Sequence, residues 1–255
     1  MLEVKDLSFS YGKTRVLNNI SFCARPGEIT TIIGANGMGK STILKCIAGL
    51  NKGEGEVLFC GKNRNILSAD EISRMVSYLN QNTVCEAELN VYEIILLGLL
   101  NDLKFKITDS DMEKVDEIMR LLSLTPFANR RISELSGGQQ QLVFIGQTLI
   151  KNPKIILMDE PTSALDLNRQ FYLMDLLKDI TKEKQFTTVV TLHHLDITAK
   201  YSDHVIVVDS GDIYQDDIPE KVFTSEMLRD VYHVEAELYA DRNGKHHLVP
   251  IDRVI

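Results

Sequence analysis

Residues 34–41 read Gly34-Ala35-Asn36-Gly37-Met38-Gly39-Lys40-Ser41 and follow the apolar, β-branched run Glu28–Ile33. A glycine-rich turn between a buried strand and a helix places successive backbone N–H groups around phosphate oxygens. In this pattern Lys40 reaches the β- and γ-phosphates, the Ser41 hydroxyl binds Mg²⁺, and Thr42 lies near the α-phosphate. The stretch therefore predicts an α/β fold that contains a phosphate loop.

Two adjacent carboxylates, Asp159 and Glu160, end a second apolar run, Ile155–Met158. Side chains alternate along a strand, so the two acids face different ways and are expected to take different roles. We expect Asp159 to hold the shell of a bound Mg²⁺ and Glu160 to orient and polarise the attacking water. Without the phosphate loop upstream, the same pair would be read as an ordinary acidic end of a strand.

A second glycine-rich segment, Leu135-Ser136-Gly137-Gly138-Gln139, lies between these two motifs and opens a helical run that reaches Ile150. A helix that starts at Gly137 directs free N–H groups and its positive dipole end towards an anion, and Ser136 stands where an N-cap belongs. The phosphate loop of the same chain already surrounds one face of a nucleotide, so the open face suits a second molecule. The three motifs in this order predict two nucleotides held between two head-to-tail copies of the chain.

The composition limits the range of functions. The chain has 255 residues, of which 44% are hydrophobic and 25% charged, as in an ordinary soluble globular protein. Its net charge of −8 argues against nucleic-acid binding driven by bulk electrostatics. The scattered Cys23, Cys46, Cys60 and Cys85 form no CxxC pair and indicate free thiols in a reducing compartment. The most apolar segment, 94–100, is shorter than the roughly 20 residues of a membrane span, so any membrane role is expected to come through a partner.

Strand and helix patterns alternate on both sides of a helical block. Strands are expected at 2–7, 17–24, 28–33, 56–60, 75–79, 154–158, 187–191 and 204–208, with a turn at Tyr11-Gly12-Lys13. Helical spacing marks 40–50, 91–100, 111–122, 137–150, 167–183 and 195–201. This order predicts a parallel-sheet core with an N-terminal antiparallel β subdomain and a helical subdomain inserted at about 82–150. We expect the main domain to span 1–235 and residues 236–255 to form a β-hairpin around Asn243-Gly244.

With these motifs in this order, nearly all of residues 1–235 resembles the nucleotide-binding subunit of an ATP-binding cassette transporter. The resemblance implies a P-loop NTPase fold and the cofactors ATP and Mg²⁺. It implies that Tyr11 stacks on adenine with Val16 beside it on the ring. Gln81, in the loop Tyr78–Gln81, then senses the γ-phosphate and the metal. The plain alternative for Tyr11 is a half-buried tyrosine in a turn. The plain alternative for Gln81 is a polar loop residue.

The same resemblance assigns roles across a dimer interface. Ser136, Gly137, Gly138 and Gln139 match the signature that caps the partner's ATP. Asp166, in the segment Ser163–Asp166, matches the part that crosses the interface. His193 matches the switch histidine that contacts the γ-phosphate, although the adjacent His194 competes for that role. The resemblance therefore names Glu160, His193, Lys40 and Gln81 as catalytic, and Ser41, Gln81 and Asp159 as metal-binding.

Some positions differ from the usual pattern. After the signature many members carry arginines, where this chain has Gln140, Leu142 and Gln147. None of these positions belongs to the set that contacts phosphate, so the difference puts salt bridges of the signature helix in doubt and leaves the chemistry in place. His233 with His246 and His247 could suggest a metal site, but surface histidines on a hairpin are the simpler interpretation.

The segment Asn90–Gly98 is similar to one that follows the glutamine loop in importers of iron–siderophore, haem and cobalamin complexes. The run Ser163–Leu167 and the ending Leu248-Val249-Pro250 point the same way. This likeness implies a subunit on the cytoplasmic face of the membrane, bound to permease subunits and served indirectly by an extracytoplasmic substrate-binding protein, without nucleic acid. A soluble cassette ATPase without a permease, such as an iron–sulfur cluster assembly ATPase, is the alternative. Repair and translation cassette proteins are disfavoured because the chain lacks a long coiled-coil insertion and a second cassette.

Overall fold

The structure is a computed structural model that describes residues 1–81, 88–99, 107–240 and 246–254. A six-stranded sheet in the order β10-β9-β3-β8-β7-β6 runs through its centre. The strands are β3 (Ile29–Ile33), β6 (Val76–Leu79), β7 (Ile155–Asp159), β8 (Thr187–Thr191), β9 (His204–Asp209) and β10 (Asp212–Asp217). All but β10 pair in parallel, and every residue of β3, β7 and β8 is buried. Burial on both faces explains why these strands are β-branched and apolar runs, with Asp159 at the end of β7 as the exception.

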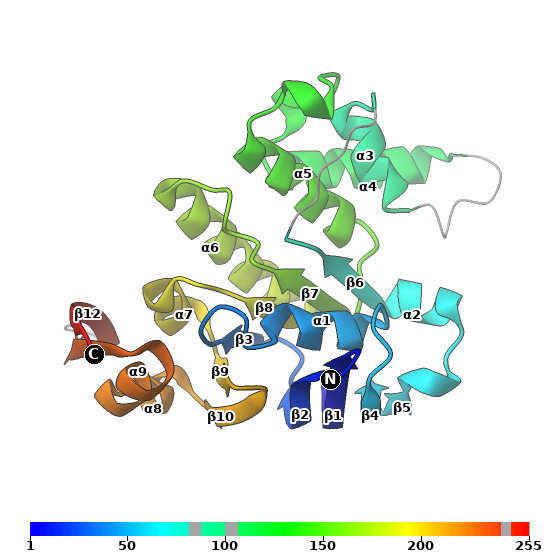
Figure 1. The fold of residues 1–255 in the computed structure, drawn as a ribbon. Coiled ribbons are helices and arrows are strands. Elements are labelled where there is room, and N and C mark those ends of the chain that lie inside the picture. Colours follow the sequence, from blue (N-terminus) through cyan, green and yellow to red (C-terminus); the bar gives the residue numbers. More distant parts are fainter. Residues whose placement is uncertain (82–87, 100–106, 241–245, 255) are drawn as a thin grey trace.

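A smaller antiparallel sheet in the order β2-β1-β4-β5 lies below the main sheet (Figure 1). Its strands are β1 (Leu2–Tyr11), β2 (Thr14–Ala24), β4 (Glu54–Phe59) and β5 (Lys62–Asn63). The expected turn at Tyr11-Gly12-Lys13 is shorter in the structure. Tyr11 pairs with Thr14 as the last residue of its strand, and Gly12, with φ +58, makes the reversal. The tyrosine is therefore held by the sheet.

Helices fill the space around the two sheets. They are α1 (Lys40–Ala48), α2 (Ala69–Met75), α3 (Val91–Leu97), α4 (Asp109–Leu121), α5 (Gly137–Leu149), α6 (Leu167–Lys184), α7 (Leu195–Tyr201), α8 (Pro219–Val222) and α9 (Ser225–Tyr232). Short 3₁₀ turns occur at Arg64–Ile66, Thr125–Phe127 and Ile132–Glu134. Helix α1 lies between the sheets, and its Ile43, Leu44 and Ile47 join the core that both sheets share.

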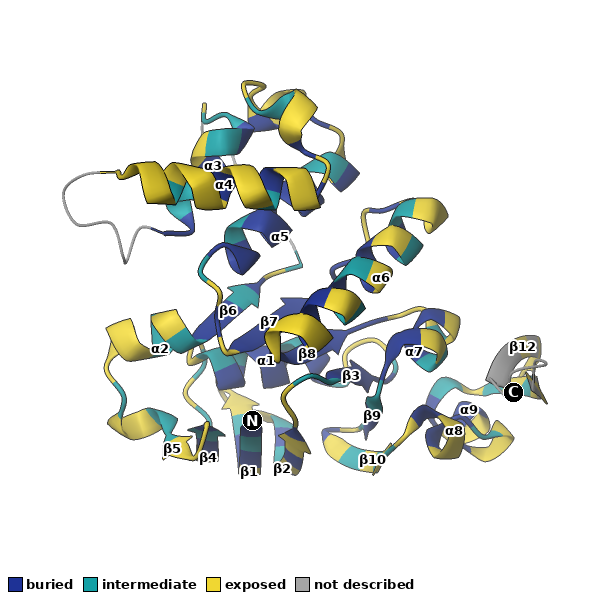
Figure 2. Ribbon diagram, turned by 180° about the vertical axis from the view of Figure 1, so that it is seen from behind, coloured by how far each residue is buried: buried dark blue, intermediate teal, exposed yellow. Residues whose placement is uncertain are grey.

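Helices α3, α4 and α5 form a group at the end of the molecule opposite the small sheet (Figure 1). The chain enters this group after β6 and leaves it before β7. Helix α4 buries Val115 and Met119 and exposes most of its outer face, which appears yellow in Figure 2. The amphipathic pattern of this helix therefore reflects packing within the group. No helix in the described ranges is both long and apolar enough to cross a membrane.

The C-terminal strands β11 (Val234–Ala240) and β12 (His246–Arg253) form the expected antiparallel pair. The proposed turn residues Asn243 and Gly244 lie outside the described residues, as does Cys85. Helices α2, α8 and α9 and strand β10 were not predicted from the sequence patterns. Each is short, and α2 contains no buried residue to mark an apolar stripe.

Candidate nucleotide-binding site

The phosphate loop joins β3 to α1. Gly39 caps α1 in the left-handed region, with φ 96. The Lys40 Nζ donates hydrogen bonds to the carbonyl oxygens of Gly34 at 2.7 Å and Ala35 at 2.9 Å. Burial lowers the pKa of Lys40, and the nearby carboxylates of Glu160 and Asp159 oppose that shift. The loop thus holds the amine of Lys40 at its centre, close to two acids.

Gly34 allows a close approach between the loop and β9. Its φ is +148, and a Cβ atom there would lie 2.1 Å from the carbonyl oxygen of Val208. We expect Gly34→Ala to destabilise the fold by about 2 kcal/mol or more, because backbone has to move to relieve the contact. Urea unfolding checks this value. Gly37→Ala is the matched control, since φ is +83 there but no atom lies within 4 Å of the added Cβ. Equal losses in the two variants would contradict the packing explanation.

Asp159 lies at the carboxyl end of β7 and accepts two hydrogen bonds on the same oxygen. The hydroxyl of Ser41 donates to its Oδ1 at 3.0 Å, and that of Thr191 at 2.7 Å. Thr191 also accepts a hydrogen bond from the backbone N–H of Glu160 at 2.9 Å. The sequence interpretation missed Thr191 as a site residue, because the strand register that places it opposite Asp159 is visible only in the folded sheet.

Glu160 receives polar contacts from two other strand ends. Gln81, just after β6, donates from Nε2 to Glu160 Oε2 at 2.5 Å, and the His193 Nε2, just after β8, contacts Oε1. The Glu160 side chain is only 10% exposed, and its φ is +50, in the left-handed region. An acidic side chain held by two partners on a strained backbone is typical of a functional site. Three separate segments therefore meet at one carboxylate.

The two adjacent histidines separate in the structure. His193 lines the pocket beside Glu160, whereas His194 is the N-cap position of α7 and does not line that pocket. The geometry therefore favours the residue that the sequence analysis preferred for the γ-phosphate contact.

The phosphate loop, Glu160 and the base-binding candidates surround one pocket of about 560 Å³. Its lining consists of Tyr11, Val16, Asn36, Gly37, Gly39, Lys40, Ser41, Thr42, Gln81, Glu160 and His193. Asp159 adjoins this lining through its hydrogen bond from Ser41. Cationic, amide and hydroxyl groups at one end and an aromatic ring at the other suit a nucleotide with its phosphates on the loop.

Tyr11 stands at the rim of the pocket with 53% of its surface exposed. Phe9 meets its ring edge-on, with the ring centroids 4.8 Å apart. The amide of Asn51, beyond the end of α1, donates to the Tyr11 hydroxyl at 3.1 Å. A ring that is both held and exposed can stack on a base. Asn51 is a further residue that sequence reasoning missed, because a lone asparagine after a helix carries no pattern.

The signature residues lie away from this pocket. Ser136 and Gln139 form a capping box at the start of α5, where the Gln139 N–H donates to Ser136 Oγ at 3.4 Å and the Ser136 N–H donates to Gln139 Oε1 at 3.0 Å. Ser136 and Gly137 are exposed. The N-terminus of α5 is therefore exposed at the surface, away from the pocket of its own chain.

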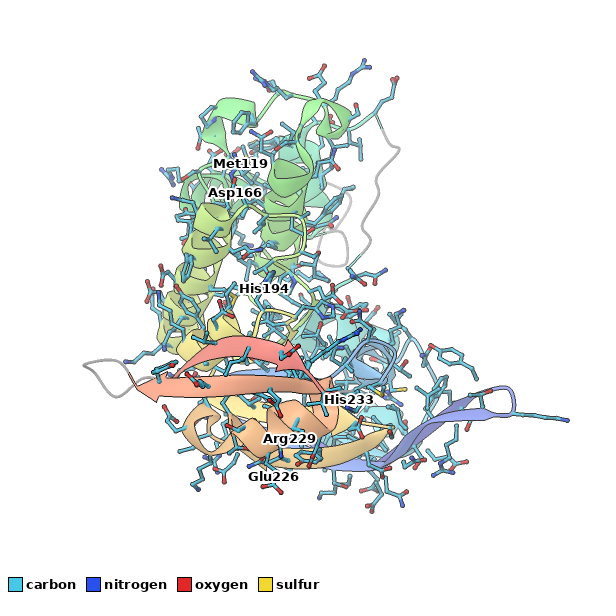
Figure 3. The ribbon with its side chains drawn as sticks, turned by 60° about the vertical axis from the view of Figure 1, so that its left-hand side comes forward. Met119, Asp166, His194, Glu226, Arg229 and His233 are labelled. Carbon is cyan, nitrogen blue, oxygen red and sulfur yellow. The ribbon has the colours of Figure 1, made fainter. Side chains whose placement is uncertain are left out.

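Asp166 lies beside the signature rather than beside the phosphate loop. It caps α6 by accepting a hydrogen bond from the Arg169 N–H at 2.9 Å (Figure 3). Its neighbour Leu165 packs on Gly138, where an added Cβ would lie 3.0 Å from a Leu165 methyl group. None of Ser136, Gly137, Gly138, Gln139 and Asp166 lines the pocket of its own chain. If these residues contact a nucleotide, it is one bound to another molecule.

Two of the residues that differ from the usual pattern after the signature, Gln140 and Leu142, make contacts within the fold. Gln140 donates from Nε2 to the carbonyl oxygens of Ile132 at 3.0 Å and Leu135 at 3.1 Å, and Leu142 is buried in the core of the helical group. These contacts fix the signature helix without an arginine.

The oxygen-bearing side chains at and near Ser41 suit a hard cation. The Ser41 hydroxyl and the Asp159 carboxylate share one hydrogen bond, and Gln81 lines the same pocket as Ser41. Mg²⁺ takes few protein ligands of this kind and completes its shell with phosphate oxygens and water. Within the described ranges, no group of three or more His, Cys, Asp or Glu residues could hold a metal by itself. The side chains of His246 and His247 lie outside the described residues.

Comparison with known proteins gives a consistent result. The ABC transporter family matches residues 17–163. The petrobactin import ATP-binding protein FpuD of Bacillus anthracis is 33% identical over 243 residues, which cover 94% of this chain and 89% of that protein. A solved ABC transporter described as of metal-chelate type, in an inward-facing conformation, has a TM-score of 0.84 and 26% identity over 98% of this chain and 97% of its own. A dimeric ATP-binding cassette bound to ADP and phosphate after hydrolysis has a TM-score of 0.76 and 30% identity over 86% of this chain and 99% of its own.

Proposed function

Because this chain belongs to the ABC transporter family and is an ATP hydrolase of the cassette type, we propose that it energises the import of a metal chelate through a separate membrane permease. The observation that carries the ATP-hydrolysing part of the proposal is the pocket in which Lys40, Ser41, Gln81, Glu160 and His193 meet. That pocket combines a phosphate cradle with a carboxylate placed to act on water.

Within one chain, the loop and Lys40 would bind the phosphates, and Tyr11 would stack on the base. Ser41, Asp159 and Gln81 would hold Mg²⁺, which when bound neutralises charge on the β- and γ-phosphates. Glu160 accepts a hydrogen bond from the attacking water and orients it, as a general base does. Gln81 and His193 already hold the two oxygens of Glu160, so the carboxylate needs little reorganisation before the reaction.

A second copy of the chain completes the pocket in this proposal. The outward-facing start of α5, with Ser136 and Gly137, supplies free N–H groups that suit the γ-phosphate of the opposing molecule. The similar cassette bound to ADP and phosphate is dimeric. ATP would close two head-to-tail copies, and hydrolysis would let them separate.

The chain would act at the cytoplasmic face of the membrane as a peripheral subunit of permease proteins. An extracytoplasmic protein that delivers the chelate would be an indirect partner. The related protein that serves petrobactin import and the structural neighbour of metal-chelate type support a chelate such as an iron–siderophore, haem or cobalamin complex. Nucleic acid is not expected as a partner, in line with the net charge of −8.

Ser136→Arg tests the shared pocket. The bulky cation at the tip of α5 is expected to block closure and lower ATP hydrolysis by at least about 100-fold, since the opposing phosphate loses its N–H donors. ATP affinity of the single chain should stay at the wild-type value, because Ser136 does not line its own pocket. Ser133→Arg, at an exposed position just before the signature, is the matched control. Hydrolysis at the wild-type rate by Ser136→Arg would exclude the shared site.

Isolation of the chain with its native permease tests the transport role. ATP hydrolysis by the complex should rise when a binding protein loaded with the right chelate is added. Siderophore-, haem- and cobalamin-loaded binding proteins are compared, with the unloaded proteins as controls. Recovery of the chain free of any membrane partner would instead favour a cassette ATPase without a permease.

A further inference from the structure

The turn between β9 and β10 lies against the phosphate loop. Its central residues, Ser210 and Gly211, both have left-handed backbone, with φ 49 and 85, as in a tight two-residue hairpin. The Ser210 N–H donates to the sulfur of Met38, in the phosphate loop, at 3.3 Å. Just before the turn, the carbonyl oxygen of Val208 occupies the space that a side chain on Gly34 would need. The turn is therefore fixed to the loop on the side of the main sheet.

The same turn also holds β2, which belongs to the small sheet and lies beside β10 (Figure 1). The Asn18 N–H of β2 donates to the Gly211 carbonyl oxygen at 2.8 Å. The Asn18 Nδ2 donates to Asp212 Oδ2 at 3.1 Å and to the Ser210 carbonyl oxygen at 3.4 Å. Gly211 packs so closely on β2 that an added Cβ would lie 2.5 Å from the Val16 carbonyl oxygen. Hydrogen bonds of Asn18 thus join the two sheets.

The orientation of the Asn18 amide is set from its other end. Arg15 donates from Nε to Asn18 Oδ1 at 2.8 Å. Because the amide oxygen accepts from Arg15, the amide nitrogen is left to donate to the turn. The side chain is half-buried and does not line the nucleotide pocket. Any effect of Asn18 on the pocket must therefore pass through the strand that carries it.

The pocket itself is divided between the two sheets. Val16 lines it from β2, and Tyr11 stands at its rim at the end of β1, paired with Thr14 of β2. The phosphate loop, with Lys40, follows a strand of the main sheet. A nucleotide that spans base site and phosphate site binds best when the distance between the sheets is set before it arrives. Asn18 lies two residues from Val16 and ties that strand to the turn that holds the loop.

We propose that Asn18 is a positioning residue for ATP binding, which holds Val16 and Tyr11 at the correct distance from the phosphate loop. This role rests on the proposed function, because that function assigns the pocket to ATP. The role concerns the base half of the nucleotide. The phosphate half depends on the loop, which keeps its own contacts with the turn through Met38 and Gly34.

Asn18→Ala removes the side-chain hydrogen bonds and keeps the backbone bond to Gly211. Loss of hydrogen bonds of this kind corresponds to about 2- to 10-fold in affinity, so the Kd for ATP with Mg²⁺ is expected to rise by that factor. The Kd for tripolyphosphate, which has no base, should stay within about 2-fold of the wild-type value, as should kcat at saturating ATP. Isothermal titration gives both Kd values, and phosphate release gives kcat.

Ser21→Ala is the matched control on the same strand. The Ser21 hydroxyl bonds to Asp6 within the small sheet, accepting from its N–H at 2.8 Å and donating to its Oδ1 at 3.3 Å. This variant loses side-chain hydrogen bonds without touching the turn, so its affinity for ATP should match that of the wild type.

An exchange of partners tests the contact directly. Asn18→Asp places two carboxylates together and should weaken ATP binding at least as much as Asn18→Ala. Adding Asp212→Asn restores a hydrogen bond in the reverse sense, so the double variant should bind ATP more tightly than Asn18→Asp alone.

An unchanged Kd for ATP in Asn18→Ala would overturn the role of Asn18, with the proposed function left standing if the wild type hydrolyses ATP. An equal rise for ATP and tripolyphosphate would also overturn it, because the loss would then lie in the loop. Failure of Asp212→Asn to improve Asn18→Asp would do the same. A wild-type protein that binds no ATP would overturn both the role and the proposed function.

Discussion

Replacing Glu160 with glutamine is expected to slow ATP hydrolysis by about 100-fold or more and to leave ATP binding intact, because a general base contributes at least that factor. Glutamine keeps the shape of the side chain but cannot take up a proton from water. Its amide can still pair with Gln81 through oxygen and with a ring nitrogen of His193 through nitrogen, so the strand ends stay together. The measurement is phosphate release under saturating ATP and Mg²⁺.

The same variant should accumulate as a closed dimer, since ATP enters the shared pocket and is not hydrolysed. Light scattering with ATP and Mg²⁺ distinguishes the dimer from the single chain. Glu183→Gln, on the exposed end of α6, is the matched control and should behave like the wild type. A Glu160→Gln protein that stays monomeric and hydrolyses ATP at the wild-type rate would show that the carboxylate has another role.

Lys40→Ala is expected to weaken ATP binding by about 100-fold, because hydrogen bonds from a cation to phosphate contribute about 1.5–3 kcal/mol each. Isothermal titration with ATP and Mg²⁺ measures the loss. Lys45→Ala, on the same helix but outside the pocket, is the control and should bind normally. Similar losses in both variants would indicate damage to α1 as a whole, and normal binding by Lys40→Ala would contradict the assigned phosphate contact.

The pH dependence of ATP binding follows from the same lysine. Burial lowers the pKa of Lys40 in the free protein, so its positive charge is lost at a lower pH than that of an exposed lysine. ATP affinity should therefore fall as the pH rises through this lowered pKa. In Lys40→Ala the alkaline fall should disappear, which separates it from titration elsewhere in the chain.

Much of the central fold could be predicted because burial leaves a direct mark on the sequence. The runs that became β3, β7 and β8 are apolar or β-branched at every position except Asp159, and the structure buries every position. Helix α2 gave no such mark, since it buries nothing and depends on the capping box between Ser68 and Glu71. Strand β10, with the sequence Asp212–Asp217, alternates between exposed and half-buried residues and reads as a polar loop.

The candidate site could be predicted where a fixed spacing carries the chemistry, as in the phosphate loop and the pair Asp159-Glu160. Supporting residues could not, because the folded chain brings them in from distant positions. Thr191 reaches Asp159 through strand register, and Asn51 reaches Tyr11 from beyond the end of α1. No short pattern records such contacts.

The left-handed backbone at Glu160 has a consequence for any attempt to raise the thermal stability of this protein. Glycine or asparagine adopts that conformation more readily than glutamate, which carries a penalty of roughly 1 kcal/mol there. A mutant library screened for heat tolerance alone should therefore enrich Gly or Asn at position 160 and discard turnover in the process. Selection for thermal stability has to be combined with selection for catalysis if the engineered protein is to keep hydrolysing ATP.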